Sequence, residues 1–88
     1  MEERRHPSPA QIRAARALLD WSQQQLAARS GIGRRTVAAY EIGGDRVTEA
    51  SITGMSDALM DAGISFSGPD QPEGVYRQGS GAKDRDGD

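Results

Sequence analysis

The stretch SQQQLAARSGIGRRTVAAYE, residues 22–41, contains two short segments of helical pattern separated by a Gly-Ile-Gly turn at 31–33. The second segment opens with Arg34 and Arg35, at the end of a helix where the backbone dipole already carries positive charge. Because the helix gains nothing locally from two cations there, the pair indicates an anion outside the protein.

The first of the two segments has strong start and stop signals. Ser22 can cap a helix, and Gln25, three residues later, completes a capping box. Trp21 and Leu26 stand at the two positions of a hydrophobic staple, which fixes the angle at which the chain enters the helix. Gly31 can adopt a positive φ and so ends the helix.

Similar signals predict further helices on both sides of this pair. Ser8 caps a segment whose apolar residues recur at helical spacing up to about residue 19. Thr48 precedes an amphipathic segment that reaches about residue 62, and Gly54 within it suggests a close approach between helices. Beyond it, Ile64–Phe66 and Gly74–Arg77 alternate with period two and could pair as a small β-hairpin.

Composition restricts the class of protein. A chain of 88 residues forms one domain at most and buries a modest fraction of its surface, so dimerisation would help to stabilise it. Cysteine is absent, which rules out disulfides and thiolate metal sites and fits a reducing cytoplasm. No segment approaches the ~20 apolar residues of a membrane span, and no signal peptide is visible.

The charge is unevenly distributed along the chain. Residues 1–46 carry eight basic and five acidic side chains, whereas residues 47–88 carry three basic and eight acidic ones. All the basic residues except Lys83 are arginines, whose planar fork suits phosphate and guanine. The asymmetry suggests one anion-facing surface, although a merely solvated surface is the simpler interpretation.

The 22–41 stretch resembles the helix-turn-helix of the XRE family, the phage repressor and Cro-like DNA-binding proteins. The residues that carry the resemblance are Leu26, Ala27, Gly31, Ile32, Val37 and Tyr40, with the Trp-Ser-Gln start at 21–23 and the sequence YEIGG at 40–44. Ala27 lies where the two helices cross, and Gly31 permits the tight turn between them. The resemblance, over about residues 10–62, implies an all-α bundle of four to five helices.

The resulting domain organisation has four parts. We expect a flexible arm at 1–8, the helix-turn-helix DNA-binding domain at 9–67 with its motif at 22–42, and a hairpin strand or loop at 68–77. Residues 78–88 lack apolar side chains beyond one alanine and are expected to be disordered.

The resemblance also implies a set of DNA contacts. In this fold the N-terminal half of the second motif helix enters the major groove. Positions matching Arg34, Arg35 and Ala39 are then the base-reading ones, and Thr36 flanks them. Backbone phosphates would be contacted by Gln23 and Arg46, while Gly33 replaces the Ser or Thr that the family often has as helix cap.

Three other charged residues each have two interpretations. Arg13 and Arg16 lie one helical turn apart and could contact phosphate, or simply form a solvated face. Glu41 lies at the end of the second motif helix, where a carboxylate is unfavourable. We expect a salt bridge to Arg35 or an intramolecular cap to compensate for it.

The sequence contains almost no residues that could perform catalysis or bind a metal. His6 is the only histidine and has neither cysteine nor a carboxylate cluster at ligand spacing, so we expect no metal, no cofactor and no enzyme.

Two functions remain open, with a detached domain of purely structural role as a weaker third. The first is a sequence-specific transcriptional regulator, a repressor-like homodimer that binds double-stranded DNA at half-sites ~34 Å apart. The second is a protein-interaction or antitoxin-like module, in which the acidic tail or the edge of the hairpin binds a protein partner. A homodimer could also form through the hairpin, because Ile64, Phe66, Val75 and Tyr76 would be costly to expose on so small a domain.

Overall fold

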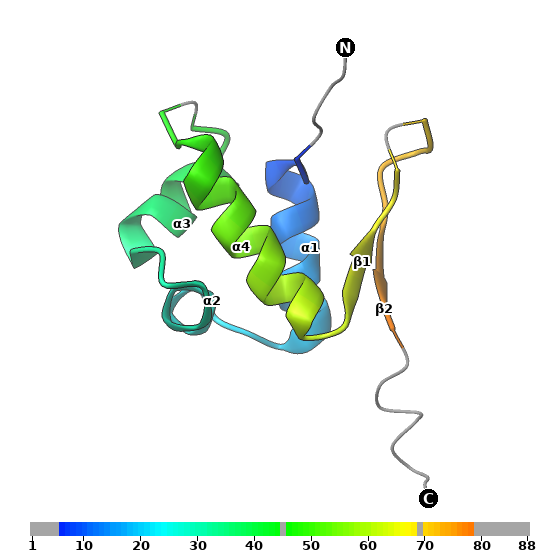
Figure 1. Cartoon of the computed structure of the whole chain (residues 1–88), viewed down its shortest axis with the longest axis horizontal. Helices are drawn as coiled ribbons and strands as arrows, with labels where there is room; N and C mark the ends of the chain where they lie inside the picture. Colours follow the sequence, from blue (N-terminus) through cyan, green and yellow to red (C-terminus); the bar gives the residue numbers. More distant parts are fainter. Residues whose placement is uncertain (1–5, 45, 69, 79–88) are drawn as a thin grey trace, which may run out of the picture.

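The computed structural model describes residues 6–44, 46–68 and 70–78. Within them, the chain forms α1 (Pro9–Leu19), α2 (Gln23–Ser30), α3 (Arg34–Glu41), α4 (Glu49–Asp61), β1 (Ile64–Phe66) and β2 (Val75–Arg77), as Figure 1 shows. The expected all-α fold with a small C-terminal hairpin is confirmed. Residues 1–5 of the expected arm and 79–88 of the expected tail lie outside the described residues.

The helix ends follow the local sequence signals. Ser8 and Ser22 each form a complete capping box, with Gln11 and Gln25 respectively. Gly31 ends α2 with φ 75°, a left-handed conformation that glycine adopts without a steric penalty. These three features fix where α1, α2 and the turn before α3 begin and end.

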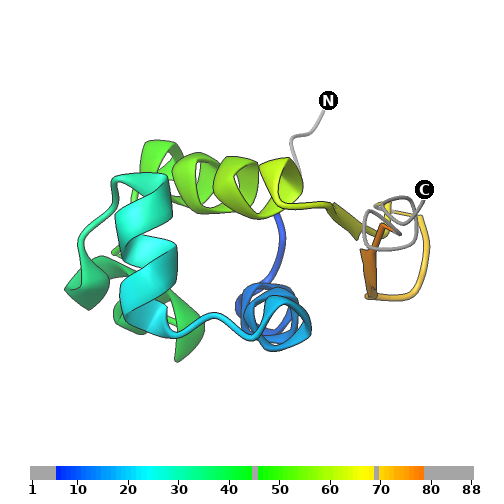
Figure 2. The same ribbon diagram turned by 90° about the horizontal axis from the view of Figure 1, so that it is seen from below.

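The core is formed by one face of each of the four helices. Fully buried side chains come from α1 (Ile12), α2 (Leu26), α3 (Val37) and α4 (Met55 and Leu59). The motif residues Ala27 and Tyr40 are also buried, at 7% and 8% exposure. Packing on this inner face leaves the outer face of α3 uncovered within the described residues, at one end of the molecule (Figures 1 and 2).

A glycine in α4 allows the turn of the motif to pack closely against that helix. A Cβ on Gly54 would lie 3.1 Å from the Cδ1 atom of Ile32, which is tighter than ordinary van der Waals contact. The expected close approach at Gly54 is therefore present, and its partner is the Ile32 side chain between α2 and α3.

The hairpin lies at the other end of the molecule from α3 (Figure 1). Its strands are antiparallel, with Ile64 paired to Arg77, Ser65 to Tyr76 and Phe66 to Val75. Ile64 is buried at 3% exposure, and Phe66 and Val75 pack partly against the core, so only Tyr76 (58% exposed) remains as the exposed apolar side chain expected there.

The N-terminal segment contacts the domain through two hydrogen bonds and through His6, whose Nε2 lies 3.9 Å from a carboxylate oxygen of Glu49. The Tyr40 hydroxyl donates to the carbonyl of Pro7, and the Ser8 hydroxyl donates to the Glu73 carboxylate. No helix in the described residues is both long and apolar enough to cross a membrane.

Candidate nucleic-acid interface

The start of α3 is open to solvent. Gly33 takes the N-cap position with φ −63° and ψ 146° and provides no side-chain cap. Arg34 and Arg35 follow and are both exposed, while Thr36 and Ala39 are half-buried. The first N–H groups of a helix lack intrahelical acceptors, so two guanidinium groups and a positive helix end lie together here.

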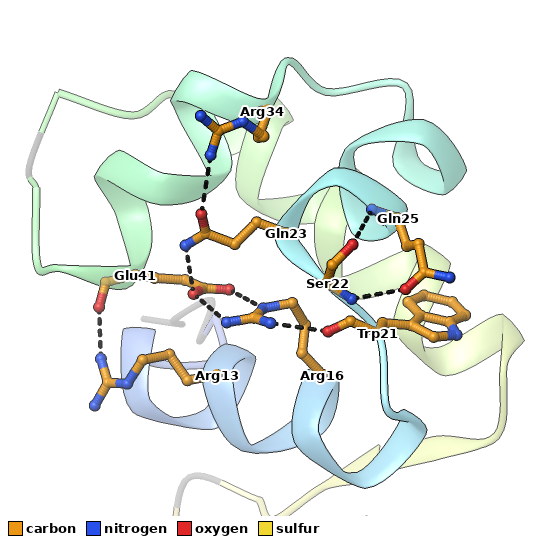
Figure 3. Close-up of polar contacts among 8 residues, drawn as sticks. All are labelled: Arg13, Arg16, Trp21, Ser22, Gln23, Gln25, Arg34 and Glu41. Atoms are coloured by element: carbon orange, nitrogen blue, oxygen red, sulfur yellow. Dashed lines mark hydrogen bonds and ion pairs between the residues drawn. The ribbon is translucent and has the colours of Figure 1, made fainter.

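Arg34 is held by a side chain of α2. Its Nη1 donates to Oε1 of Gln23 at 3.3 Å, and Nε2 of Gln23 donates in turn to Oε1 of Glu41 at 3.0 Å (Figure 3). Gln23 therefore connects the first residue of α3 to the last residue of the same helix. We expected this side chain to contact a phosphate. Instead, its Oε1 and its Nε2 both form hydrogen bonds within the protein.

Glu41 pairs with α1. The Nε and Nη2 atoms of Arg16 donate to its two carboxylate oxygens at 2.7 and 2.8 Å, a bidentate geometry that Figure 3 shows. Nη1 of Arg16 donates to the carbonyl of Trp21 at 2.8 Å. The carboxylate of Glu41 is compensated as expected, but the expected partner Arg35 is wrong, because the pair forms with Arg16.

Arg13 completes the polar cluster from the same helix. Its Nη1 donates to the backbone carbonyl of Glu41, one of the carbonyls at the C-terminal end of α3 that have no helical donor. A cation at that end is favourable, and it offsets the unfavourable carboxylate beside it. Arg16, at 20% side-chain exposure, is thus neither on a solvated face nor available for phosphate.

The cluster keeps Glu41 ionised despite its burial. The side chain is only 2% exposed, and this burial alone would raise its pKa. Hydrogen bonds from Arg16 and Gln23 and the charges of Arg16 and Arg13 outweigh burial, so that the pKa of Glu41 is lowered from its ordinary value. The hydrogen bond to Glu41 raises the pKa of Arg16 in the same way.

This lowered pKa makes stability depend on pH in the acid range. The unfolded chain, in which Glu has a pKa of about 4.3, binds the proton at higher pH than the folded chain does. We expect the contribution of Glu41 to the free energy of unfolding to be complete above about pH 5. This contribution should be lost as the pH falls through the lowered pKa of Glu41 in the folded chain. Urea titrations between pH 2.5 and 7 should show this acid limb, and Glu41→Gln should flatten it.

The control for this experiment is Asp57→Asn. Asp57 is an exposed carboxylate in the middle of α4, so the variant should keep the acid limb of the parent chain. A Glu41→Gln chain with the same stability and the same pH profile as the parent would contradict the role of the buried pair.

The remaining predicted residues are not brought into this cluster. Arg46 is exposed in the loop after α3, at the opposite end of that helix from Arg34 and Arg35.

The roles of Arg13 and Arg16 were not predicted from the sequence. The one available signal was that two arginines spaced one helical turn apart accompany a single acidic residue in the motif.

Comparison with known proteins adds one match. The helix-turn-helix family model HTH_3 matches residues 12–59, from the first half of α1 to the last turn of α4, and so covers more than half of the chain. No curated protein matches the chain.

Proposed function

Because the chain belongs to the XRE-type helix-turn-helix family of DNA-binding regulators, we propose that it acts as a repressor-like homodimer on a pseudo-palindromic operator. The N-terminal half of α3 would enter the major groove, as the second helix of this motif does in repressors of known geometry. Base edges would be read by Arg34 and Arg35, since Arg to guanine O6 and N7 is the commonest specific contact.

One observation carries this proposal. Arg34 is exposed, yet its guanidinium is tied through Gln23 to the buried Glu41–Arg16 pair. A side chain held in place before binding loses less conformational entropy when it meets its target. A plain solvated charge would not need such support.

The other predicted contacts have supporting roles. With its side chain occupied, Gln23 would contact phosphate through its backbone N–H at the first turn of α2, where a helix end attracts anions. Arg46 would contact the DNA backbone from the loop after α3. Thr36 and Ala39 are small and half-buried, so they would let the groove approach closely or touch a thymine methyl group.

The decisive experiment is selection of bound sequences from a random duplex pool. We expect an enriched motif made of two inverted half-sites with centres ~34 Å apart. Absence of any enriched sequence at low salt would contradict the proposal. A protein that instead co-purifies with the chain, and binds it independently of Arg34 and Arg35, would favour the protein-interaction function.

Affinity for the selected site should depend only moderately on salt. If Arg34, Arg35 and Arg46 of each protomer all neutralised phosphate, the slope of log K against log salt would be about −5, so with Arg34 and Arg35 on base edges we expect a shallower slope. Fluorescence anisotropy at several KCl concentrations measures this slope. A much steeper value would mean that cations other than these carry most of the binding.

A further inference from the structure

The outer face of α3 ends in an apolar side chain. Ile42 follows the last residue of α3 as its C-cap and is 85% exposed, more than any other large apolar side chain in the described residues. It belongs neither to the core nor to the side chains that pack against the core. A single exposed isoleucine is ordinary on a protein surface, so its position on the helix decides whether it has a role.

Ile42 shares the face of α3 that carries Arg35. The backbone N–H of Ile42 donates to the carbonyl of Ala38 at 3.3 Å, so the helical path continues to this residue. Seven residues turn an α-helix through about 20° less than two full turns, which places Ile42 almost in line with Arg35 along the helix. Ala38 and Ala39 lie one turn before Ile42 on the same side and present only methyl groups. The outer face of α3 is therefore cationic at its start and apolar at its end.

A Schellman turn holds the backbone at Ile42 in place. Gly43, with φ 90°, donates to the carbonyl of Tyr40 at 3.0 Å, and Gly44 donates to the carbonyl of Ala39 at 2.8 Å. Because this turn fixes the end of α3, Ile42 loses little backbone freedom when it meets another molecule.

We propose that Ile42 packs against the 5-methyl group of a thymine in the major groove and so reads one base pair of each half-site beyond those that the arginines reach. This inference rests on the proposed DNA-binding function and adds a contact to it. The 5-methyl group of thymine is the apolar feature that the major groove presents. Cytosine lacks this methyl group and presents an amino donor, which isoleucine would shield from water without accepting its hydrogen bond.

The length of α3 sets the distance between this thymine and the guanine read by Arg35. Seven residues advance ~10.5 Å along a helix, and successive base pairs of duplex DNA are ~3.4 Å apart. With Arg35 at a guanine, Ile42 therefore lies about three base pairs further along the groove. The methyl group projects from the base edge into the groove, so a side chain at the end of α3 can reach it while the N-terminal half of the helix lies deeper.

Deoxyuridine substitution in the selected operator tests the contact. Deoxyuridine pairs as thymine does but lacks the 5-methyl group, and each thymine of the half-site is replaced in turn. The guanine of Arg35 is the one whose preference is lost in Arg35→Ala. At the thymine about three base pairs from it, we expect the parent chain to lose affinity about fourfold per half-site, or about 15-fold when both half-sites are changed. The selection pool contains no methylated cytosine, so a methyl group that is read belongs to thymine.

The same titrations with Ile42→Ala separate the methyl contact from a general loss of binding. We expect this variant to bind the thymine and deoxyuridine operators within about twofold of each other, both as weakly as the parent binds the deoxyuridine operator. Its selected motif should lose the thymine and keep the guanines. Met60→Ala, which truncates an exposed apolar side chain on α4, is the matched control and should keep the ratio of the parent. Thermal melts confirm that both variants are folded.

Three results would overturn the contact: a motif without thymine at that position, a parent chain indifferent to deoxyuridine at every thymine, or an Ile42→Ala chain that keeps the preference of the parent for thymine. In each case, a motif whose guanines depend on Arg34 and Arg35 would leave the proposed function intact. A pool with no enriched motif would overturn the proposed function and this contact together.

Discussion

Replacing Arg16 with methionine is expected to lower the free energy of unfolding by about 3 kcal/mol. Methionine keeps most of the apolar stem but removes both hydrogen bonds to the Glu41 carboxylate, which is 2% exposed. A buried charge left without its partner costs about 3–5 kcal/mol, and Arg13 and Gln23 soften the loss here. For a domain of this size the melting temperature should drop by roughly 12–24 °C.

A double-mutant cycle separates this pair from ordinary packing. Arg16→Met with Glu41→Leu removes both charges together, and we expect it to recover most of the lost stability. Arg29→Met is the matched control, since Arg29 is exposed and lies over the Trp21 ring at 4.6 Å, and should cost less than about 1 kcal/mol. Additive losses from Arg16→Met and Glu41→Leu would show that the two side chains do not act as a unit.

The features predicted correctly from sequence are those set by neighbours along the chain. Ser8 with Gln11 and Ser22 with Gln25 form their capping boxes across three residues, and a left-handed Gly31 ends α2. Each of these depends on a few adjacent side chains and on backbone conformation. Local signals therefore located the helix starts and the turn of the motif.

The partner of Glu41 could not be predicted because it is set by packing. Arg16 is 25 residues away in sequence, and the two meet only once α1 lies beside α3. Arg35 was the nearer arginine in sequence, but it points into solvent from the first turn of α3. The connection from Gln23 to Arg34 was missed for the same reason, since it needs the crossing angle of α2 and α3.

The hairpin was predicted in position but not in packing. Alternation located both strands, whereas the sequence could not show that Phe66 and Val75 turn toward the core. That distinction depends on how the strand register meets α1 and α4. Because Phe66 and Val75 turn toward the core, the hairpin exposes Tyr76 and the edge of β2, rather than its whole apolar face, within the described residues.

Loss of Arg34 or of Arg35 should weaken binding to the selected operator by about 30-fold or more. A specific base contact is worth about 1–3 kcal/mol, and one substitution in a homodimer removes it from both half-sites. Arg34→Ala and Arg35→Ala should each also broaden the motif at one position of each half-site. Anisotropy titrations and repeated selection measure the two effects, and Arg29→Ala, which alters an exposed arginine of α2, should change neither.

The contrast between alanine and lysine at residue 34 decides how Arg34 acts. If it only neutralises phosphate, Arg34→Lys should bind the operator and random duplex as the parent does, because the charge is kept. If it reads guanine through its fork, Arg34→Lys should lose operator affinity and keep non-specific affinity and the salt slope. We expect the second result, because the Gln23 amide accepts from the guanidinium and holds it at the start of α3. If the Arg34→Lys chain and the parent chain bound the operator with equal affinity, Arg34 would contribute charge alone.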